Sequence, residues 1–131
     1  MKIGIDIHGV LDKNPFFKQM ALSMCFHQHG NEVHIITGTS IELALKDLEK
    51  LDMLKDFHYT HLYSITDDLI SRGIPVEWKD GNNPFFPYKE WDKAKAEYCA
   101  KHGIDIHFDD TQRYEKYFET TMIFYNNFVK N

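Results

Sequence analysis

The sequence has few cysteines and no long apolar run. Its two cysteines, Cys25 and Cys99, fall in predicted helices and lack the paired spacing of a disulfide framework. No segment approaches the ~20 apolar residues of a membrane-spanning helix, and the first residues lack the layout of a signal peptide. These absences favour a reduced, cytoplasmic protein with no membrane partner.

An excess of positive charge is also missing. The formal net charge is −5, with 15 Lys and Arg against 20 Asp and Glu, whereas proteins that bind a nucleic-acid backbone usually carry a basic surface. Nucleic acid is therefore disfavoured as the main partner, although a phosphorylated macromolecular end stays open as a substrate. A length of 131 residues with 43% apolar residues predicts one globular domain over residues 1–131.

The segments that are present alternate between strand and helix. Apolar runs predict strands over residues 2–7, 33–36, 58–63, 104–108 and 120–125. The helical periodicity predicts helices from 14 to a stop at Gly30, over 41–54, in a short segment ending near 73, and over 90–102 and 113–118. Helices of this length between strands form right-handed βαβ units. The predicted class is α/β, a three-layer Rossmann-like domain with a mostly parallel central sheet.

Residues 74–88 are the least regular part of the chain. Their Gly, Asn and Pro content is typical of a loop and predicts a loop or small lid. Aromatic side chains gather here and just beyond: Trp78, Phe85, Phe86, Tyr88 and Trp91. Both stacking on a substrate ring and ordinary core packing stay open for them.

Side chains suited to phosphate chemistry follow three of the predicted strands. Asp6 ends the first, Thr37 and Gly38 end the second, and Asp109 and Asp110 end the fourth. The carboxyl ends of parallel strands share one edge, so these groups should converge in one crevice. Paired carboxylates can hold Mg²⁺ there, and a further carboxylate can attack phosphorus. The Thr37 hydroxyl and the backbone amide of that turn can bind phosphoryl oxygens.

A cation is needed to balance these carboxylates and a phosphate. On the helix before the fourth strand, Lys95 lies four residues from both Trp91 and Cys99, on the stripe that faces the core. Lys93 shares its face with Glu97, which indicates solvated surface. Lys95 is therefore the first choice and Lys93 the second.

Four motifs in this order resemble those of the haloacid dehalogenase-like (HAD) superfamily. They are residues 3–10 (IGIDIHGV), residues 34–38 (HIITG), Lys95 and residues 106–110 (IHFDD). The resemblance covers residues 3–110. It implies a Rossmann-like sheet, bound Mg²⁺, and hydrolysis of a phosphomonoester through an aspartyl-phosphate.

The resemblance also implies a role for each matching residue. The implied catalytic residues are Asp6 as the nucleophile, His8, Thr37 and Lys95. The implied phosphate-binding residues are Thr37, Gly38 and Lys95. The implied metal ligands are Asp6, the backbone carbonyl of His8, Asp109 and Asp110. Which of the last two touches the metal stays open.

One position departs from the family pattern. Family phosphatases carry Asp two residues after the nucleophile, as general acid for the leaving group and base for the attacking water; here the residue is His8. Imidazole, with a reference pKa of about 6.5, can do such work, but an imidazolium beside Mg²⁺ is disfavoured. Three outcomes stay open: a slow phosphatase, altered chemistry, or a phosphate- or nucleotide-binding protein without turnover.

The spacing of the motifs bounds the substrate. The segments from Asp6 to Thr37 and from Thr37 to Lys95 leave no room for a large cap domain. An open site suits a large phosphorylated substrate, or closure by another subunit in a homo-oligomer. An interaction module without site chemistry is ranked last, because no exposed apolar helix face singles it out.

Eight histidines raise the question of zinc. His27 with His29, and His58 with His61, do not have the spacing of ligands within their predicted elements. The sequence therefore predicts no transition-metal site.

Overall fold

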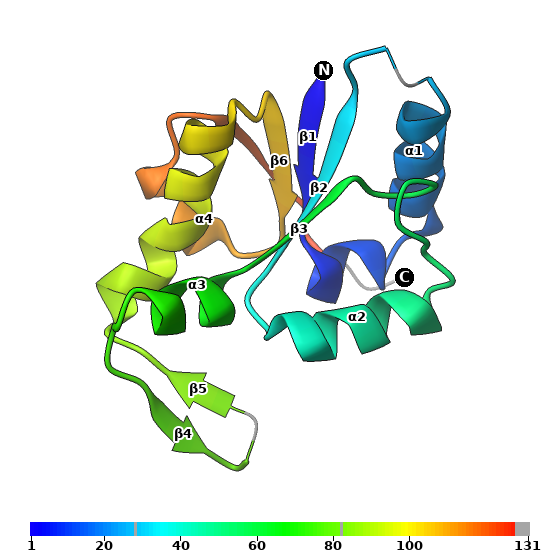
Figure 1. The fold of residues 1–131 in the computed structure, drawn as a ribbon. Coiled ribbons are helices and arrows are strands. Elements are labelled where there is room, and N and C mark those ends of the chain that lie inside the picture. The colour runs from blue at the N-terminus through cyan, green and yellow to red at the C-terminus, as the bar shows by residue number, and fades with distance from the viewer. Residues whose placement is uncertain (28, 82, 128–131) are drawn as a thin grey trace.

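A five-stranded sheet forms the centre of the computed structural model, which describes residues 1–27, 29–81 and 83–127 (Figure 1). The strand order is β3-β2-β1-β6-β7, and every neighbouring pair is parallel. The strands are β1 (Lys2–Ile5), β2 (Glu32–Thr37), β3 (His61–Ser64), β6 (Ile106–Asp109) and β7 (Thr121–Phe124). The predicted α/β class with a parallel central sheet is confirmed.

Helices cover both faces of the sheet and complete three layers (Figure 1). On one side lie α1 (Pro15–Phe26) and α2 (Ile41–Lys50); on the other lie α3 (Ile65–Ser71), α4 (Tyr88–His102) and the short η2 (Gln112–Tyr117). Ile35 packs with Phe17 and Leu48 on the first side, whereas Ile36 packs with Cys99 on the second. This alternation explains why the central strands are apolar throughout.

Local signals fix where the helices begin and end. The Asn14 side chain accepts a hydrogen bond from Phe16 N at 3.0 Å at the start of α1, and Ser40 Oγ accepts one from Leu43 N at 3.3 Å at the start of α2. At the end of α4, Gly103 takes a left-handed φ of 65°. Two side-chain N-caps and one C-terminal glycine thus mark these helix boundaries.

The first helix ends earlier than predicted. We expected it to stop at Gly30, but α1 ends at Phe26. The Asn31 side-chain amide donates to the carbonyl oxygens of Met24 at 3.3 Å and His27 at 2.8 Å. A side chain beyond the helix thus satisfies two of its last carbonyls, and no further turn is needed.

Two other boundaries differ from the prediction. α2 ends at Lys50 instead of residue 54, because the chain turns into a left-handed φ of 54° at Asp52. β3 begins at His61 instead of residue 58, because His58 is buried in the preceding turn, where its Nδ1 accepts a hydrogen bond from Leu54 N at 3.0 Å. The remaining elements lie within a few residues of their predicted places.

Residues 74–88 contain a β-hairpin where a loop was predicted. β4 (Glu77–Lys79) pairs antiparallel with β5 (Asn83–Phe85), and the hairpin projects beyond α3 (Figure 1). Pro84 hid this strand from a sequence prediction, but proline is tolerated in a strand that lies at an edge. Among the described residues no separate cap domain accompanies the sheet. Nor does any helix in the described ranges have the length and apolar character that crossing a membrane requires.

Candidate active site

The ends of β1 and β6 bring two carboxylates together at the carboxyl edge of the sheet. Ile5 pairs with Phe108, and the amide of Asp6 donates to the Phe108 carbonyl at 3.1 Å. Asp6 and Asp109 are the next residues after this pair on each strand; Asp6 is 6% exposed and Asp109 is fully buried. Buried carboxylates at this edge need compensating charge.

Lys95 of α4 supplies that charge. Its ammonium Nζ lies 3.1 Å from Asp6 Oδ1 and 2.8 Å from Asp109 Oδ2, and the side chain is 4% exposed. Lys93 lies on the surface side of α4, where it pairs with Glu90 at 3.5 Å. Of the two candidate lysines, the structure brings Lys95 into the site and leaves Lys93 outside it.

The three charged groups shift one another's titration. Burial raises the pKa of Asp6 to about 8, against the attraction of Lys95 and with added repulsion from Asp109. Burial also works against ionisation of Asp109, but Lys95 and His107 outweigh it and hold the pKa of that carboxyl well below its usual range. Burial disfavours the charged form of Lys95 too, yet the two carboxylates outweigh it and raise the pKa of the ammonium. A further cation beside Asp6 would favour its ionised form.

A third carboxylate completes what we call the carboxylate cluster, made of Asp6, Asp109 and Asp110. One oxygen of each lies within 4.8 Å of the others. The Asn127 amide donates to Asp110 Oδ2 at 3.1 Å and to the Gly9 carbonyl at 2.9 Å, which ties Asp110 to the turn after β1. Mg²⁺ prefers oxygen ligands and is usually held by one or two carboxylates together with water. The donor set therefore fits this ion.

The carboxylates keep acceptor capacity for such an ion. Asp109 accepts hydrogen bonds from Lys95 and His107 on Oδ2, and from Thr111 N at 3.0 Å on Oδ1. Asp110 accepts from Asn127, and its other oxygen lies 3.3 Å from the Thr111 hydroxyl. Since an ionised carboxylate has about four acceptor positions, both residues retain one or more for a cation.

Gly9 makes the approach of Asp110 to the turn possible. It lies in η1 (Ile7–Leu11) with a left-handed φ of 88°, and a Cβ there would collide with the Asp110 carboxylate and lie 2.6 Å from Asn127 Nδ2. We expect Gly9→Ala to lower the free energy of unfolding by about 1–3 kcal/mol more than Gly73→Ala. Gly73 is the matched control, because its φ is 72° and nothing lies within 4 Å of a Cβ built there. Equal losses in chemical denaturation would show that the collision is relieved without consequence.

The turn after β2 is held by contacts with α3 and α4. Thr37 is fully buried, with its hydroxyl 3.3 Å from that of Thr39. The Gly38 carbonyl accepts hydrogen bonds from the Thr66 amide at 3.3 Å and the Thr66 hydroxyl at 2.6 Å. A Cβ at Gly38 would lie only 2.7 Å from the Trp91 ring. Glycine is therefore required where this turn passes α4.

His8 lies in η1, and its side chain has a partner on α2. Its ring nitrogen Nε2 lies 2.9 Å from Asp47 Oδ2, and the side chain is 49% exposed. The structure thus pairs the imidazole of His8 with a partly exposed carboxylate of α2, which is not one of the residues at the strand ends. His8 contributes its backbone to the turn beside Asp6, with φ −76° and ψ 122°.

Residues not singled out in the sequence also belong to the site. His107 Nε2 lies 2.8 Å from an Asp109 oxygen, and the two-residue spacing within β6 was the available signal, because alternate residues of a strand share a face. Asn127 follows β7, and nothing in the sequence marks it. The Tyr114 ring lies 5.5 Å from the buried ammonium, and its hydroxyl accepts a hydrogen bond from Trp91 Nε1 at 2.8 Å.

A pocket of about 650 Å³ extends from the Gly38 turn to the hairpin. Trp78 and Phe85 contribute half-exposed rings to it, 50% and 51% exposed, and Trp91 forms part of its wall. Lys46 of α2 also lines it. The pocket offers aromatic surfaces and one cation beside the turn that carries Thr37.

Comparison with protein-family models, with curated proteins and with solved structures gives no match for this chain.

Proposed function

We propose that this chain is a Mg²⁺-dependent phosphohydrolase of the haloacid dehalogenase-like type, which cleaves a phosphomonoester through an aspartyl-phosphate on Asp6. The observation that carries the proposal is the buried ammonium of Lys95, 3.1 Å from Asp6 and 2.8 Å from Asp109. With Asp110 close to both carboxylates, the carboxyl edge of the sheet offers a nucleophile, a cation for phosphoryl oxygens and the oxygen ligands of a metal.

In the first step, an Asp6 oxygen attacks phosphorus, and the bond from phosphorus to the ester oxygen breaks. The products are an acyl phosphate on Asp6 and an alcohol or phenol. Lys95 balances negative charge on the phosphoryl group, and the Thr37 hydroxyl and Gly38 amide are the proposed hydrogen-bond donors to its oxygens. Mg²⁺ held by Asp6, Asp109, Asp110 and the His8 carbonyl would neutralise phosphoryl charge and orient the group.

In the second step, water attacks phosphorus, the bond to Asp6 breaks, and inorganic phosphate leaves. This step needs a base for the water, just as the first needs an acid for the leaving oxygen. The contact of His8 with Asp47 turns its imidazole to another partner. We infer that an imidazole engaged with Asp47 serves both proton transfers poorly, which predicts a slow enzyme whose rate depends on its leaving group.

A comparison of leaving groups tests the proposal. With Mg²⁺ present, we expect measurable phosphate release from an aryl phosphate, whose phenolate leaves without a proton, and much slower release from an alkyl phosphate. His8→Asp should speed the alkyl phosphate by at least ~10²-fold, the usual contribution of general acid catalysis. Asp47→Ala is the control that removes the partner of His8 without adding a carboxylate. No release from either ester by the natural chain or by His8→Asp would contradict the proposal.

The contact of His8 with Asp47 also favours a second candidate, a phosphate- or nucleotide-binding protein that does not turn over. This alternative predicts that phosphate with Mg²⁺ raises the melting temperature while no ester is hydrolysed. Turnover by the natural chain would exclude it. Turnover by His8→Asp alone would support it, since the framework would then be complete except at one position.

Several features bear on substrate and setting. The aromatic walls of the 650 Å³ pocket support a phosphate ester that carries a planar ring, such as a nucleotide. Cys25 and Cys99 are both buried free thiols, which supports a reducing, cytoplasmic setting. A homo-oligomer that closes the open edge stays a prediction.

A further inference from the structure

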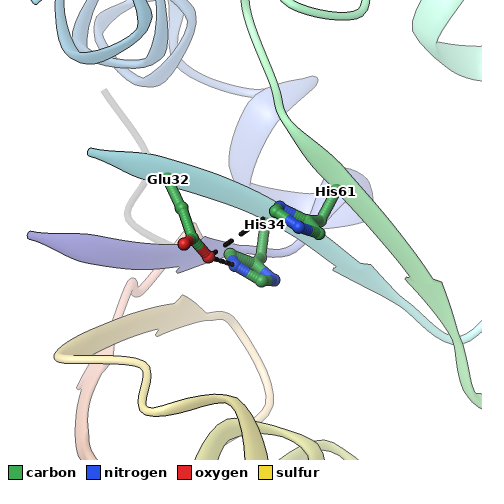
Figure 2. Close-up of side chains that lie close together, drawn as sticks. All are labelled: Glu32, His34 and His61. Carbon is green, nitrogen blue, oxygen red and sulfur yellow. Dashed lines mark hydrogen bonds and ion pairs between the residues drawn. The ribbon is translucent and has the colours of Figure 1, made fainter. Parts of the chain in front are cut away.

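A second group of ligand-type side chains lies at the amino end of β2, at the other end of the sheet from the carboxylate cluster. Glu32 and His34 are two residues apart on β2 and therefore share a face. His34 pairs in register with His61, the first residue of β3 (Figure 2). Glu32, His34 and His61 are called here the histidine cluster. The spacing of His58 and His61 in the sequence does not reveal this neighbour of His61 across the sheet.

The atoms of this cluster are spaced for a common metal ion. Glu32 Oε1 lies 2.8 Å from His34 Nε2 and 3.9 Å from His61 Nδ1, and the three atoms lie within 4.8 Å of one another. Ligands at about 2.0–2.1 Å from a tetrahedral zinc ion are about 3.3 Å apart. The two imidazole rings are stacked, with centroids 4.1 Å apart. The electron pair of an imidazole nitrogen lies in the plane of its ring, so the half-exposed ring of His61 must rotate out of this stack before both nitrogens can face one ion.

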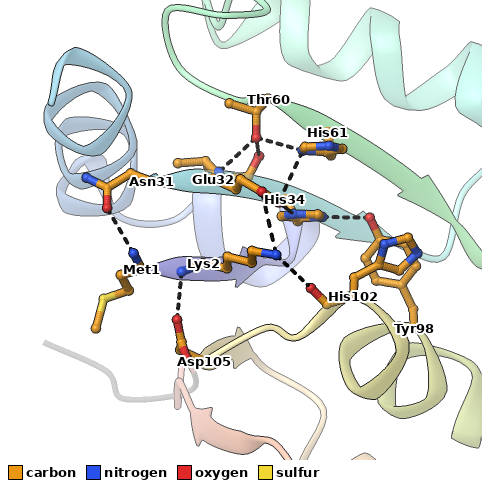
Figure 3. A network of polar contacts seen from close by, with 11 residues as sticks. Met1, Lys2, Asn31, Glu32, His34, Thr60, His61, Tyr98, His102 and Asp105 are labelled. Carbon is orange, nitrogen blue, oxygen red and sulfur yellow. Dashed lines mark hydrogen bonds and ion pairs between the residues drawn. The ribbon is translucent and has the colours of Figure 1, made fainter. Parts of the chain in front are cut away.

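The surroundings hold His34 in place as a ligand should be held. Its side chain is 1% exposed, and its second ring nitrogen, Nδ1, lies 2.6 Å from the Tyr98 hydroxyl (Figure 3). Metal-bound histidines usually donate the other ring N–H to such a partner. When Nδ1–H of the neutral ring donates a hydrogen bond to the Tyr98 oxygen, Nε2 carries the electron pair that can bind an ion.

The neighbours of Glu32 and His61 determine which contacts an ion must replace. The Lys2 ammonium lies 3.6 Å from Glu32 Oε2, so Oε1 is the oxygen that faces the imidazoles (Figure 3). The Thr60 hydroxyl donates to the Val33 carbonyl at 3.1 Å, so its oxygen accepts a hydrogen bond from His61 Nδ1 at 2.8 Å. Metal ligands must carry a free electron pair, so an ion bound here replaces this contact and the hydrogen bond between His34 and Glu32.

We propose that Glu32, His34 and His61 form a transition-metal site of the zinc type, with one coordination position open to solvent. The side chains of Glu32 and His61 are 32% and 48% exposed, so an ion can enter from that side. A cavity of about 500 Å³, lined by Tyr98 and His102, lies beside the cluster. Three protein ligands with one open position is the arrangement of zinc ions that bind water or substrate.

Titration with Co²⁺, a spectroscopic substitute for Zn²⁺, tests this proposal. The titration is carried out in excess Mg²⁺, which fills the carboxylate cluster. We expect one Co²⁺ to bind with the intense visible absorption of a four-coordinate ion, and Zn²⁺ to displace this Co²⁺. His61→Ala should weaken binding by at least ~100-fold, and Tyr98→Phe by ~10-fold, as for partners of metal-bound histidines. His29→Ala removes an exposed histidine outside the cluster and should leave the affinity unchanged.

Two results would overturn the proposal. One is the absence of visible absorption with Co²⁺ in the correctly folded natural chain. The other is binding with equal affinity in the natural chain and in His61→Ala. Nitrogen NMR adds an independent readout, because Zn²⁺ should shift His34 Nε2 and His61 Nδ1 selectively. An unchanged spectrum of these two nitrogens would contradict the assignment of ligands.

Discussion

Replacing Asp6 with Asn should lower the rate of phosphate release from an aryl phosphate by at least ~10³-fold, as expected for loss of a nucleophile. The amide keeps the shape of the side chain but cannot form an acyl phosphate. It also removes a carboxyl whose pKa burial raises to about 8. The folded structure should therefore be retained, and the rate should fall without a fall in melting temperature.

The control for this experiment is Asp56→Asn. Asp56 is exposed and has a left-handed φ of 69°, a conformation that Asn also adopts readily. The control variant should keep both rate and melting temperature. A folded Asp6→Asn variant that releases phosphate at the natural rate would contradict nucleophilic attack by Asp6.

Replacing Lys95 with Met should have the largest effect on stability. Lys95 is the cation shared by the buried carboxylates of Asp6 and Asp109. Removing one partner from a buried charge pair costs about 3–5 kcal/mol. At pH 8 the melting temperature should fall by ~10 °C or more. Thermal unfolding followed by circular dichroism measures the change.

The loss of stability in Lys95→Met should depend on pH, in a direction set by the pKa of Asp6. A carboxyl with a higher pKa in the folded protein than in the unfolded chain binds more protons when folded. The folded protein therefore loses stability as pH rises from the ordinary value of 3.8 towards the folded value of about 8. Lys95 opposes the rise in the pKa of Asp6 by stabilising the ionised carboxylate. Removal of Lys95 should therefore destabilise the protein more at pH 8, where Asp6 ionises, than at pH 5.

Two further variants separate this effect from general damage to α4. Lys93→Met breaks only the partly exposed pair with Glu90 and should change stability by no more than ~0.5 kcal/mol. In the Asp6→Asn background, Lys95→Met should cost less, because one of the two stranded carboxylates is gone. Equal losses for Lys95→Met and Lys93→Met would show that no buried charge cluster depends on Lys95.

The strand ends and the core-facing lysine could be predicted because they follow from simple periodicities. Asp6, Thr37 and Asp109 each end an apolar run, and parallel strands align such ends at one edge. Lys95 lies on the same helical stripe as Trp91, because the two residues are four positions apart in the sequence. Element ends were harder, as α1 shows: its end depends on a hydrogen bond from Asn31, which lies beyond the helix.

Contacts across the sheet escaped prediction. Pairing of His34 with His61 depends on the register between β2 and β3, which no pattern within one strand reveals. Asn127 reaches Asp110 only because β7 lies beside β6. The hairpin of residues 74–88 was hidden by Pro84. These features need the three-dimensional neighbours of each strand.

Detection of a phosphoryl group on Asp6 is the most direct test of the proposed function. The natural chain would be mixed with Mg²⁺ and an aryl phosphate, quenched in acid, digested and mapped by mass spectrometry. We expect one added phosphoryl group on the peptide that contains Asp6, and none without Mg²⁺ or in Asp6→Asn. Because the proposed mechanism has no carboxylate base at position 8, the adduct should accumulate more in the natural chain than in His8→Asp. Phosphate release with no phosphoryl group on Asp6, or with one on another residue, would contradict the proposed function.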